Sequence, residues 1–177
     1  MERQRPSQAK RLAVCAILAG LSLAVLYVGA LSGIFDLCAV VVGAVCIVFT
    51  VIEIGGPYPW LTAAVTGTLC LLLLPDKLVA LEYIALGGVY PILKAPMERL
   101  HPALRWTLKL LYFNGALTAY YLLATLVLHT EDFAEVLAVF VYLAANLFFL
   151  LFDRFLTTAI SLYLTRYRKR FRIKGLK

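Results

Sequence analysis

The chain has 177 residues, of which 63% are hydrophobic and 15% are charged, and its mean hydropathy is +0.89. A soluble domain of this length could not hide so much apolar surface, so the composition excludes an ordinary globular protein and predicts an integral membrane protein. The formal net charge is +7. No nucleic-acid-binding motif accompanies this charge, and basic clusters beside apolar segments favour contact with anionic lipids, so membrane lipids rather than nucleic acid are the expected partners.

Residues 1–11 are polar and basic, and the apolar run after them is too long for a removable signal peptide and lacks a small-residue cleavage site. We therefore expect this run to be retained as the first membrane helix. The whole chain, 1–177, is predicted to be one integral membrane domain. It comprises the basic tail 1–11, a helical bundle over 12–152, and a helix extension with a second basic tail over 153–177.

Successive apolar runs between residues 12 and 152 predict the fold. A membrane β-barrel would need short segments that alternate apolar and polar residues, whereas these runs are apolar on every face. The expected fold is therefore all-α, with six transmembrane helices in one bundle, because a helix pairs its own backbone groups in lipid. The runs are Leu12–Leu31, Ile34–Ile52, Trp60–Leu74, Leu78–Leu93, Leu110–Leu128 and Phe133–Phe152. The third and fourth are short and closely joined, so a re-entrant hairpin remains an alternative to two crossings.

The distribution of charge between the runs predicts the orientation. With the N-terminus in the cytoplasm, all of the seventeen lysine and arginine residues except Lys77 and Arg154 fall in cytoplasmic segments. The outer loops then carry Asp36, Asp76 and the Glu131–Asp132 pair. Basic residues near span ends resist translocation, so both termini are expected in the cytoplasm.

Turn chemistry marks several helix boundaries. Gly55–Pro59 should end the second helix, and the sequence Leu-Pro-Asp-Lys at 74–77 should form a tight outer turn. The segment before Lys109 is predicted to hold a short surface helix. The helical pattern of the final run continues from Phe133 to about Tyr167, which is longer than one crossing requires.

Polar and small residues recur at helical spacing. Ala16, Gly20 and Ala24 form a small face on the first helix, which suits either packing within the bundle or docking onto another membrane subunit. Two polar stripes are predicted on the fifth and sixth helices, and they can equally be glue between helices. The stripes are Asn114, Thr118, Tyr121 and Thr125, and Tyr142, Asn146, Asp153 and Thr157. Asp153 and Arg154 are adjacent and diverge by about 100°, so each is expected to find a different partner.

Glu82 is the acidic residue that we expect to matter most, because a carboxylate inside a membrane helix should face the bundle, a cavity or a cation. An interfacial position is the alternative. The sequence contains none of the catalytic motifs that would indicate an enzyme, and no cofactor is expected. Cys15, Cys38, Cys46 and Cys70 lack metal-ligand spacing and are predicted to be buried apolar residues. His101 and His129 fall on opposite membrane faces, so no metal site is expected.

The layout resembles the substrate-capture (S) subunits of energy-coupling factor transporters, which bind a vitamin or a similar nutrient. The features that match are the basic start, the segment Leu12–Ser22, six spans in a short chain and a basic C-terminus. The resemblance implies that Ala16, Gly20 and Ala24 dock a transmembrane coupling subunit that works with ATPases. The family pattern is an Ala-x-x-x-Ala pair, from which Gly20 departs.

The resemblance also implies a small-molecule site toward the outer side of the later helices. The residues at that depth are Glu82, Tyr83, Tyr121, Thr125 and Tyr142. The first outer loop, about Ser32–Asp36, is short for a lid over such a site. The competing hypothesis is a non-enzymatic membrane scaffold or assembly factor, whose long final helix and basic tail recruit partners.

Overall fold

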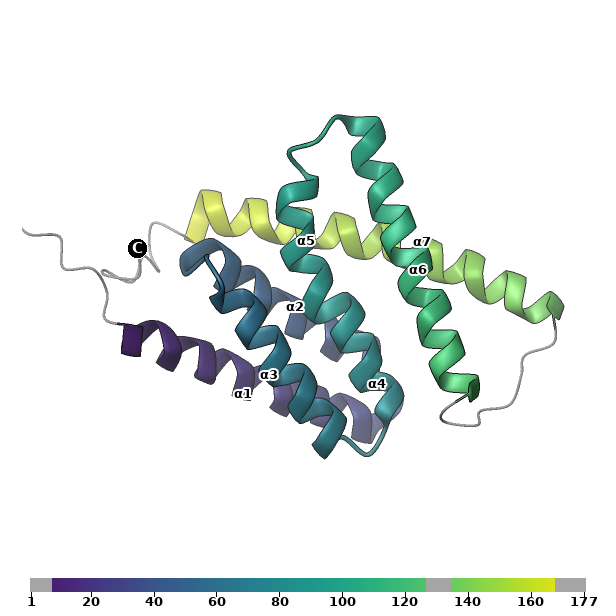
Figure 1. Ribbon diagram of the computed structural model, residues 1–177, viewed down its shortest axis with the longest axis horizontal. Helices are drawn as coiled ribbons and strands as arrows, with labels where there is room; N and C mark the ends of the chain where they lie inside the picture. The colour runs from purple at the N-terminus through teal and green to yellow at the C-terminus, as the bar shows by residue number, and fades with distance from the viewer. Residues whose placement is uncertain (1–7, 127–134, 168–177) are drawn as a thin grey trace, which may run out of the picture. The chain divides into compact units, whose positions relative to one another are not determined.

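The computed structural model describes residues 8–126 and 135–167, and every regular element in these ranges is a helix (Figure 1). The predicted all-α class is therefore confirmed. The elements are α1 (Gln8–Ser32), α2 (Asp36–Glu53), α3 (Tyr58–Leu73), α4 (Lys77–Glu82), the π-helical η1 (Tyr83–Val89), α5 (Tyr90–Met97), α6 (Pro102–Leu126), α7 (Glu135–Leu162) and the π-helical η2 (Tyr163–Tyr167).

Within the described residues, four helical stretches are long and apolar enough to cross a membrane. Two of them are α1 and α2, the third is the uninterrupted stretch Lys77–Met97, and the fourth is Phe140–Arg166. The α3 helix is apolar but has 16 residues. The chain is thus an all-helical protein with several potential membrane spans, and six full crossings stay a prediction.

The helix boundaries follow the turn chemistry of the sequence. Gly33, Gly55 and Gly56 have φ angles of 65°, 66° and 62°, a region that glycine enters without steric cost, and they separate α1, α2 and α3. Before α4, the carboxylate of Asp76 accepts a hydrogen bond of 2.8 Å from the main-chain nitrogen of Leu78. The predicted turn at 74–77 and the predicted end of the second helix are confirmed, and the outer position of that turn stays a prediction.

Two other predictions about boundaries have different outcomes. The segment before Lys109 holds no separate surface helix, because α6 itself begins at Pro102 and continues through it. The long final helix is confirmed over the described residues, since α7 is followed directly by η2 up to Tyr167. Its predicted start at Phe133 lies outside the described residues.

By their contacts the described residues form two units. One comprises those up to Leu93 together with those from Ala159 onward, and the other lies within Lys94–Thr158. In the first unit α1 packs on α2 and α3, and η1 packs on the same two helices. Glycine allows this close approach: a Cβ atom added to Gly43 would lie 2.8 Å from Tyr83 Cε2, and one added to Gly87 would lie 2.5 Å from Tyr83 Cδ2. The ring of Tyr83 therefore fills the space that two glycines leave.

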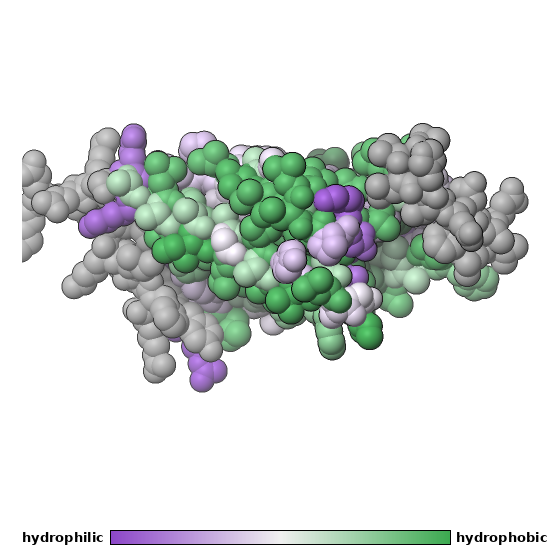
Figure 2. Space-filling view, turned by 90° about the horizontal axis from the view of Figure 1, so that it is seen from below, coloured by the Kyte–Doolittle hydropathy of each residue, from purple (hydrophilic) through white to green (hydrophobic). Residues whose placement is uncertain are grey.

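The outward faces of the helices carry large apolar side chains. Figure 2 shows hydrophobic residues over most of the described surface on one face of the molecule. Ile17 is 69% exposed and Leu72 is 71% exposed, as suits side chains in contact with lipid. Cys15, Cys46 and Cys70 are buried, as predicted, but the prediction was wrong for Cys38, which α2 turns outward.

Candidate functional site

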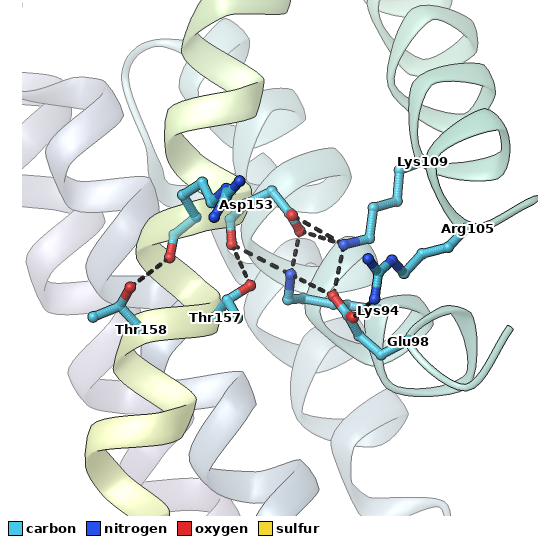
Figure 3. Close-up of polar contacts among 8 residues, drawn as sticks. Lys94, Glu98, Arg105, Lys109, Asp153, Thr157 and Thr158 are labelled. Atoms are coloured by element: carbon cyan, nitrogen blue, oxygen red, sulfur yellow. Dashed lines mark hydrogen bonds and ion pairs between the residues drawn. The ribbon is translucent and has the colours of Figure 1, made fainter. Parts of the chain in front are cut away.

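The densest polar feature is a cluster of five charged side chains in the Lys94–Thr158 unit (Figure 3). Lys94 lies on α5, Glu98 follows that helix, Arg105 and Lys109 lie on α6, and Asp153 lies on α7. The consecutive helices α5 and α6 and the later helix α7 thus bring their charges together. We refer to these five residues as the charge cluster.

Asp153 is the centre of the charge cluster. Lys109 Nζ donates to both of its carboxylate oxygens at 2.9 Å. Lys94 Nζ donates to Oδ1 of the same carboxylate and to the Asp153 carbonyl oxygen at 3.3 Å. Asp153 is 2% exposed and each lysine is 1% exposed. Burial of an isolated charge would cost several kcal/mol, so these three ions stabilise one another by direct pairing.

Glu98 forms the more open end of the charge cluster. It accepts from Lys109 Nζ at 2.6 Å and from Arg105 Nη1 at 3.0 Å, and it pairs with Lys94 Nζ at 3.1 Å. Partial burial alone would raise the pKa of Glu98, but the hydrogen bonds from the two lysines outweigh it and lower the pKa below its ordinary value. The side chains of Glu98 and Arg105 are 34% and 29% exposed, so the protein leaves this end of the charge cluster partly uncovered.

Arg154 does not belong to the charge cluster. Its side chain is exposed, whereas Asp153 beside it is buried, as the predicted divergence of the two residues requires. The Arg154 carbonyl oxygen accepts a hydrogen bond of 2.9 Å from Thr158. Of the predicted pair, the structure thus places only Asp153 among the buried ions.

Polar contacts continue along α6 and α7 beyond the charge cluster. Asn114 and Asn146 exchange reciprocal amide hydrogen bonds of 3.0 and 3.1 Å. The hydroxyls of Thr118 and Tyr142 lie 3.1 Å apart. These pairs match later residues of α6 with earlier residues of α7, so the two helices are antiparallel. Two residues of each predicted stripe therefore meet the other stripe, which is the behaviour expected of glue between helices.

A stacked pair of aromatic rings lies between the charge cluster and these amides. The centroids of Phe113 and Phe149 are 4.4 Å apart, with an angle of 10° between the ring planes, and both side chains are buried. An offset stack of this kind adds about 0.5–1.5 kcal/mol to the value of the buried area. Ionic, aromatic and amide contacts therefore follow one another between α6 and α7.

The residues expected to bind a small molecule are divided between the two units. Glu82 ends α4 and is half-buried, and Tyr83, the first residue of η1, is fully buried. In the other unit, Thr125 donates to the Tyr121 carbonyl oxygen at 3.0 Å, and Tyr142 contacts Thr118. Glu82 and Tyr83 are thus adjacent at the start of a π-helical turn, a feature that is frequent at functional sites.

The small face of α1 points outward. Ala16, Gly20 and Ala24 are all exposed, and no atom of the described residues lies within 4 Å of a Cβ placed on Gly20. A different set of α1 residues is buried: Cys15, Ala19, Ser22, Leu26 and Gly29. Since α1 packs on α2 and α3, its small face remains open.

Sequence reasoning missed most of the charge cluster, because it assigned Lys94, Glu98 and Lys109 to aqueous inner loops. The spacing of Lys94 and Glu98, four residues apart, was the available signal. The ion pairs of the charge cluster can hold α5, α6 and α7 together. Among residues 8–126 and 135–167, no group of three or more His, Cys, Asp or Glu side chains is placed to hold a metal ion.

Comparison of the chain with protein-family models, with curated proteins and with solved structures found no match.

Proposed function

We propose that this protein is the substrate-capture subunit of a transporter of the energy-coupling factor type. It would bind a small, vitamin-like nutrient at the outer side of a bacterial plasma membrane. ATP-driven partner subunits would then deliver that nutrient, and the protein itself would catalyse no reaction. In this proposal both termini lie in the cytoplasm and six helices cross the bilayer.

The outward small face of α1 is the observation that carries the proposal. Ala16, Gly20 and Ala24 are exposed on a helix whose other side is already packed. A membrane helix associates with another through small residues that let the backbones approach, since lipid gives no hydrophobic driving force. An open small face on an otherwise packed helix therefore suits the docking of a separate membrane subunit.

The proposed binding of a nutrient rests on Glu82. Glu82 precedes the π-helical turn η1, and its carboxylate would accept hydrogen bonds from a ligand. Tyr121, Thr125 and Tyr142 belong to the Lys94–Thr158 unit and are not assigned to this site. Tyr83 is fully buried between Gly43 and Gly87, so its role would be to shape the helix packing beneath the ligand.

Co-purification from the native host tests the proposal. The full-length protein should recover a transmembrane coupling subunit and ATPases, and Gly20→Phe should abolish that recovery because the new ring projects from the small face. Leu72→Phe is the matched control: Leu72 is 71% exposed on α3, so an added ring there also faces outward. Equal recovery of ATPases by both variants, or recovery of none by the wild type, would contradict the proposal.

Ligand capture is tested separately with a panel of radiolabelled water-soluble vitamins and the purified protein. We expect one vitamin to bind tightly and Glu82→Gln to weaken its binding by at least tenfold, the loss typical of a charged hydrogen bond. If no vitamin binds and the variant behaves as the wild type, Glu82 is not a ligand-binding residue.

A non-enzymatic scaffold is the second candidate. The observation that favours it is the set of contacts between α6 and α7, where Asn114 pairs with Asn146 and Thr118 with Tyr142 instead of facing a ligand. Co-purification separates the two functions. A scaffold would recover division or envelope proteins without transporter ATPases.

A further inference from the structure

The charge cluster contains more positive than negative charge. Its three cations, Lys94, Arg105 and Lys109, face two carboxylates, Glu98 and Asp153. The charge cluster therefore carries a net charge of one positive unit. An anion from outside the cluster would complement that excess.

The two lysines have no capacity left for such an anion. An ammonium group has three N–H donors. Lys94 directs them to Glu98 and to two oxygens of Asp153, and Lys109 does the same with Glu98 and both carboxylate oxygens of Asp153. Both ammonium groups are also almost fully buried.

Arg105 is the cation that can accept a further partner. Its guanidinium has five N–H donors, and Nη1 holds Glu98 at 3.0 Å. Its side chain is 29% exposed, in contrast to the 1% of Lys109 one turn along the same helix. Glu98 therefore fixes the orientation of the guanidinium, and the Arg105 side chain as a whole stays partly exposed. A fork of this shape suits the oxygens of a phosphate.

The surroundings of Arg105 are those of a membrane interface. Leu100 and Leu104, in and just after the turn from α5 to α6, are 38% and 49% exposed. Arg99 beside them is exposed, and Trp106 is half-buried with its ring 5.2 Å from Lys109 Nζ. Exposed leucines, arginines and a tryptophan in one short segment are typical of protein that meets acyl chains and headgroups together.

We propose that the turn between α5 and α6 binds an anionic phospholipid, with the Arg105 guanidinium on the phosphate and Leu100 and Leu104 against the acyl chains. Glu98 acts as the positioning residue for the guanidinium. The Arg105 guanidinium would also bind free phosphate, but free phosphate has no apolar part that could contact the exposed leucines. The proposal does not depend on the transport function.

Quenching of tryptophan fluorescence by brominated lipid tests this site directly. The chain contains two tryptophans, Trp60 and Trp106, so a Trp60→Phe background leaves Trp106 as the reporter beside Arg105. The full-length protein is placed in phosphatidylcholine vesicles that contain equal mole fractions of brominated phosphatidylglycerol or brominated phosphatidylcholine. We expect phosphatidylglycerol to quench Trp106 more strongly, and Arg105→Gln to lower its apparent affinity about fivefold.

The control is Arg166→Gln, which removes an exposed arginine of η2 and should leave the lipid preference unchanged. Equal quenching by the two brominated lipids in the Trp60→Phe protein that retains Arg105 overturns the proposal. This outcome does not depend on whether the Arg105→Gln variant folds. An unchanged preference in Arg105→Gln also overturns it. A third arm adds inorganic phosphate against chloride at equal ionic strength. Loss of the preference in phosphate alone would show a site for the free anion instead of a lipid.

Discussion

Replacement of Asp153 by asparagine should destabilise the protein severely. At an effective dielectric constant of 20, two unit charges 2.9 Å apart, the distance from Lys109 Nζ to Asp153 Oδ1, attract by about 6 kcal/mol. Desolvation of each buried ion opposes this attraction by several kcal/mol. The Asp153→Asn protein keeps both lysines in a site where each is 1% exposed, without the carboxylate that they share. We expect a loss of about 3–5 kcal/mol in the free energy of unfolding, the range found when one partner of a buried pair is removed.

Reversible unfolding in mixed detergent micelles measures this loss. The matched control is Arg154→Gln, at the next residue of α7, whose side chain is exposed and should change the free energy of unfolding by less than about 0.5 kcal/mol. A second variant, Asp153→Leu combined with Lys94→Met, removes one charge of each sign. It should recover much of the loss, because an apolar replacement of a buried pair is often neutral. An Asp153→Asn protein as stable as Arg154→Gln would refute the account of the charge cluster.

Three further predictions concern packing, polar contacts and pH. Gly87→Ala should cost about 1–3 kcal/mol, because its Cβ would lie 2.5 Å from a tyrosine ring, whereas Gly20→Ala, with open space, should be neutral or slightly stabilising in the same unfolding assay. A double-mutant cycle with Asn114→Ala and Asn146→Ala should give a coupling energy of about 0.6–1.7 kcal/mol, and additive effects would contradict the reciprocal amide pair. Because the folded protein lowers the pKa of Glu98, this residue should stabilise the wild type relative to Glu98→Gln above the unfolded pKa of about 4.3 and lose that effect as pH falls through the folded pKa. Thermal unfolding from pH 7 to pH 3 measures the difference between the two proteins, and a difference that grows toward low pH would contradict the assignment.

The helices could be predicted from the sequence because their signals are local. Apolar runs gave the approximate extents of the helical segments, and glycine, proline and Asp76 marked where several of them end. The contact between the two polar stripes could also be inferred from the sequence, because Asn114 and Asn146 each lie at helical spacing from other polar residues.

The charge cluster could not be predicted in the same way. Lys94 and Asp153 are 59 residues apart, and Lys109 and Asp153 are 44 apart, so no periodicity connects them. A lysine at the end of an apolar run is usually expected to be exposed to water. Only tertiary packing determines that such a lysine is buried. The outward position of Cys38 was missed for a related reason, because an apolar run does not show which of its faces meets lipid.

The orientation of the chain underlies the proposed carrier function, and cysteine labelling in intact cells tests it most directly. The four native cysteines are replaced by alanine, and single cysteines are introduced as Arg5→Cys, Asp76→Cys and Lys174→Cys. A maleimide that cannot cross the membrane should label position 76 in intact cells, and positions 5 and 174 only after permeabilisation. Labelling of position 5 or position 174 in intact cells would place that terminus outside and contradict the proposed carrier.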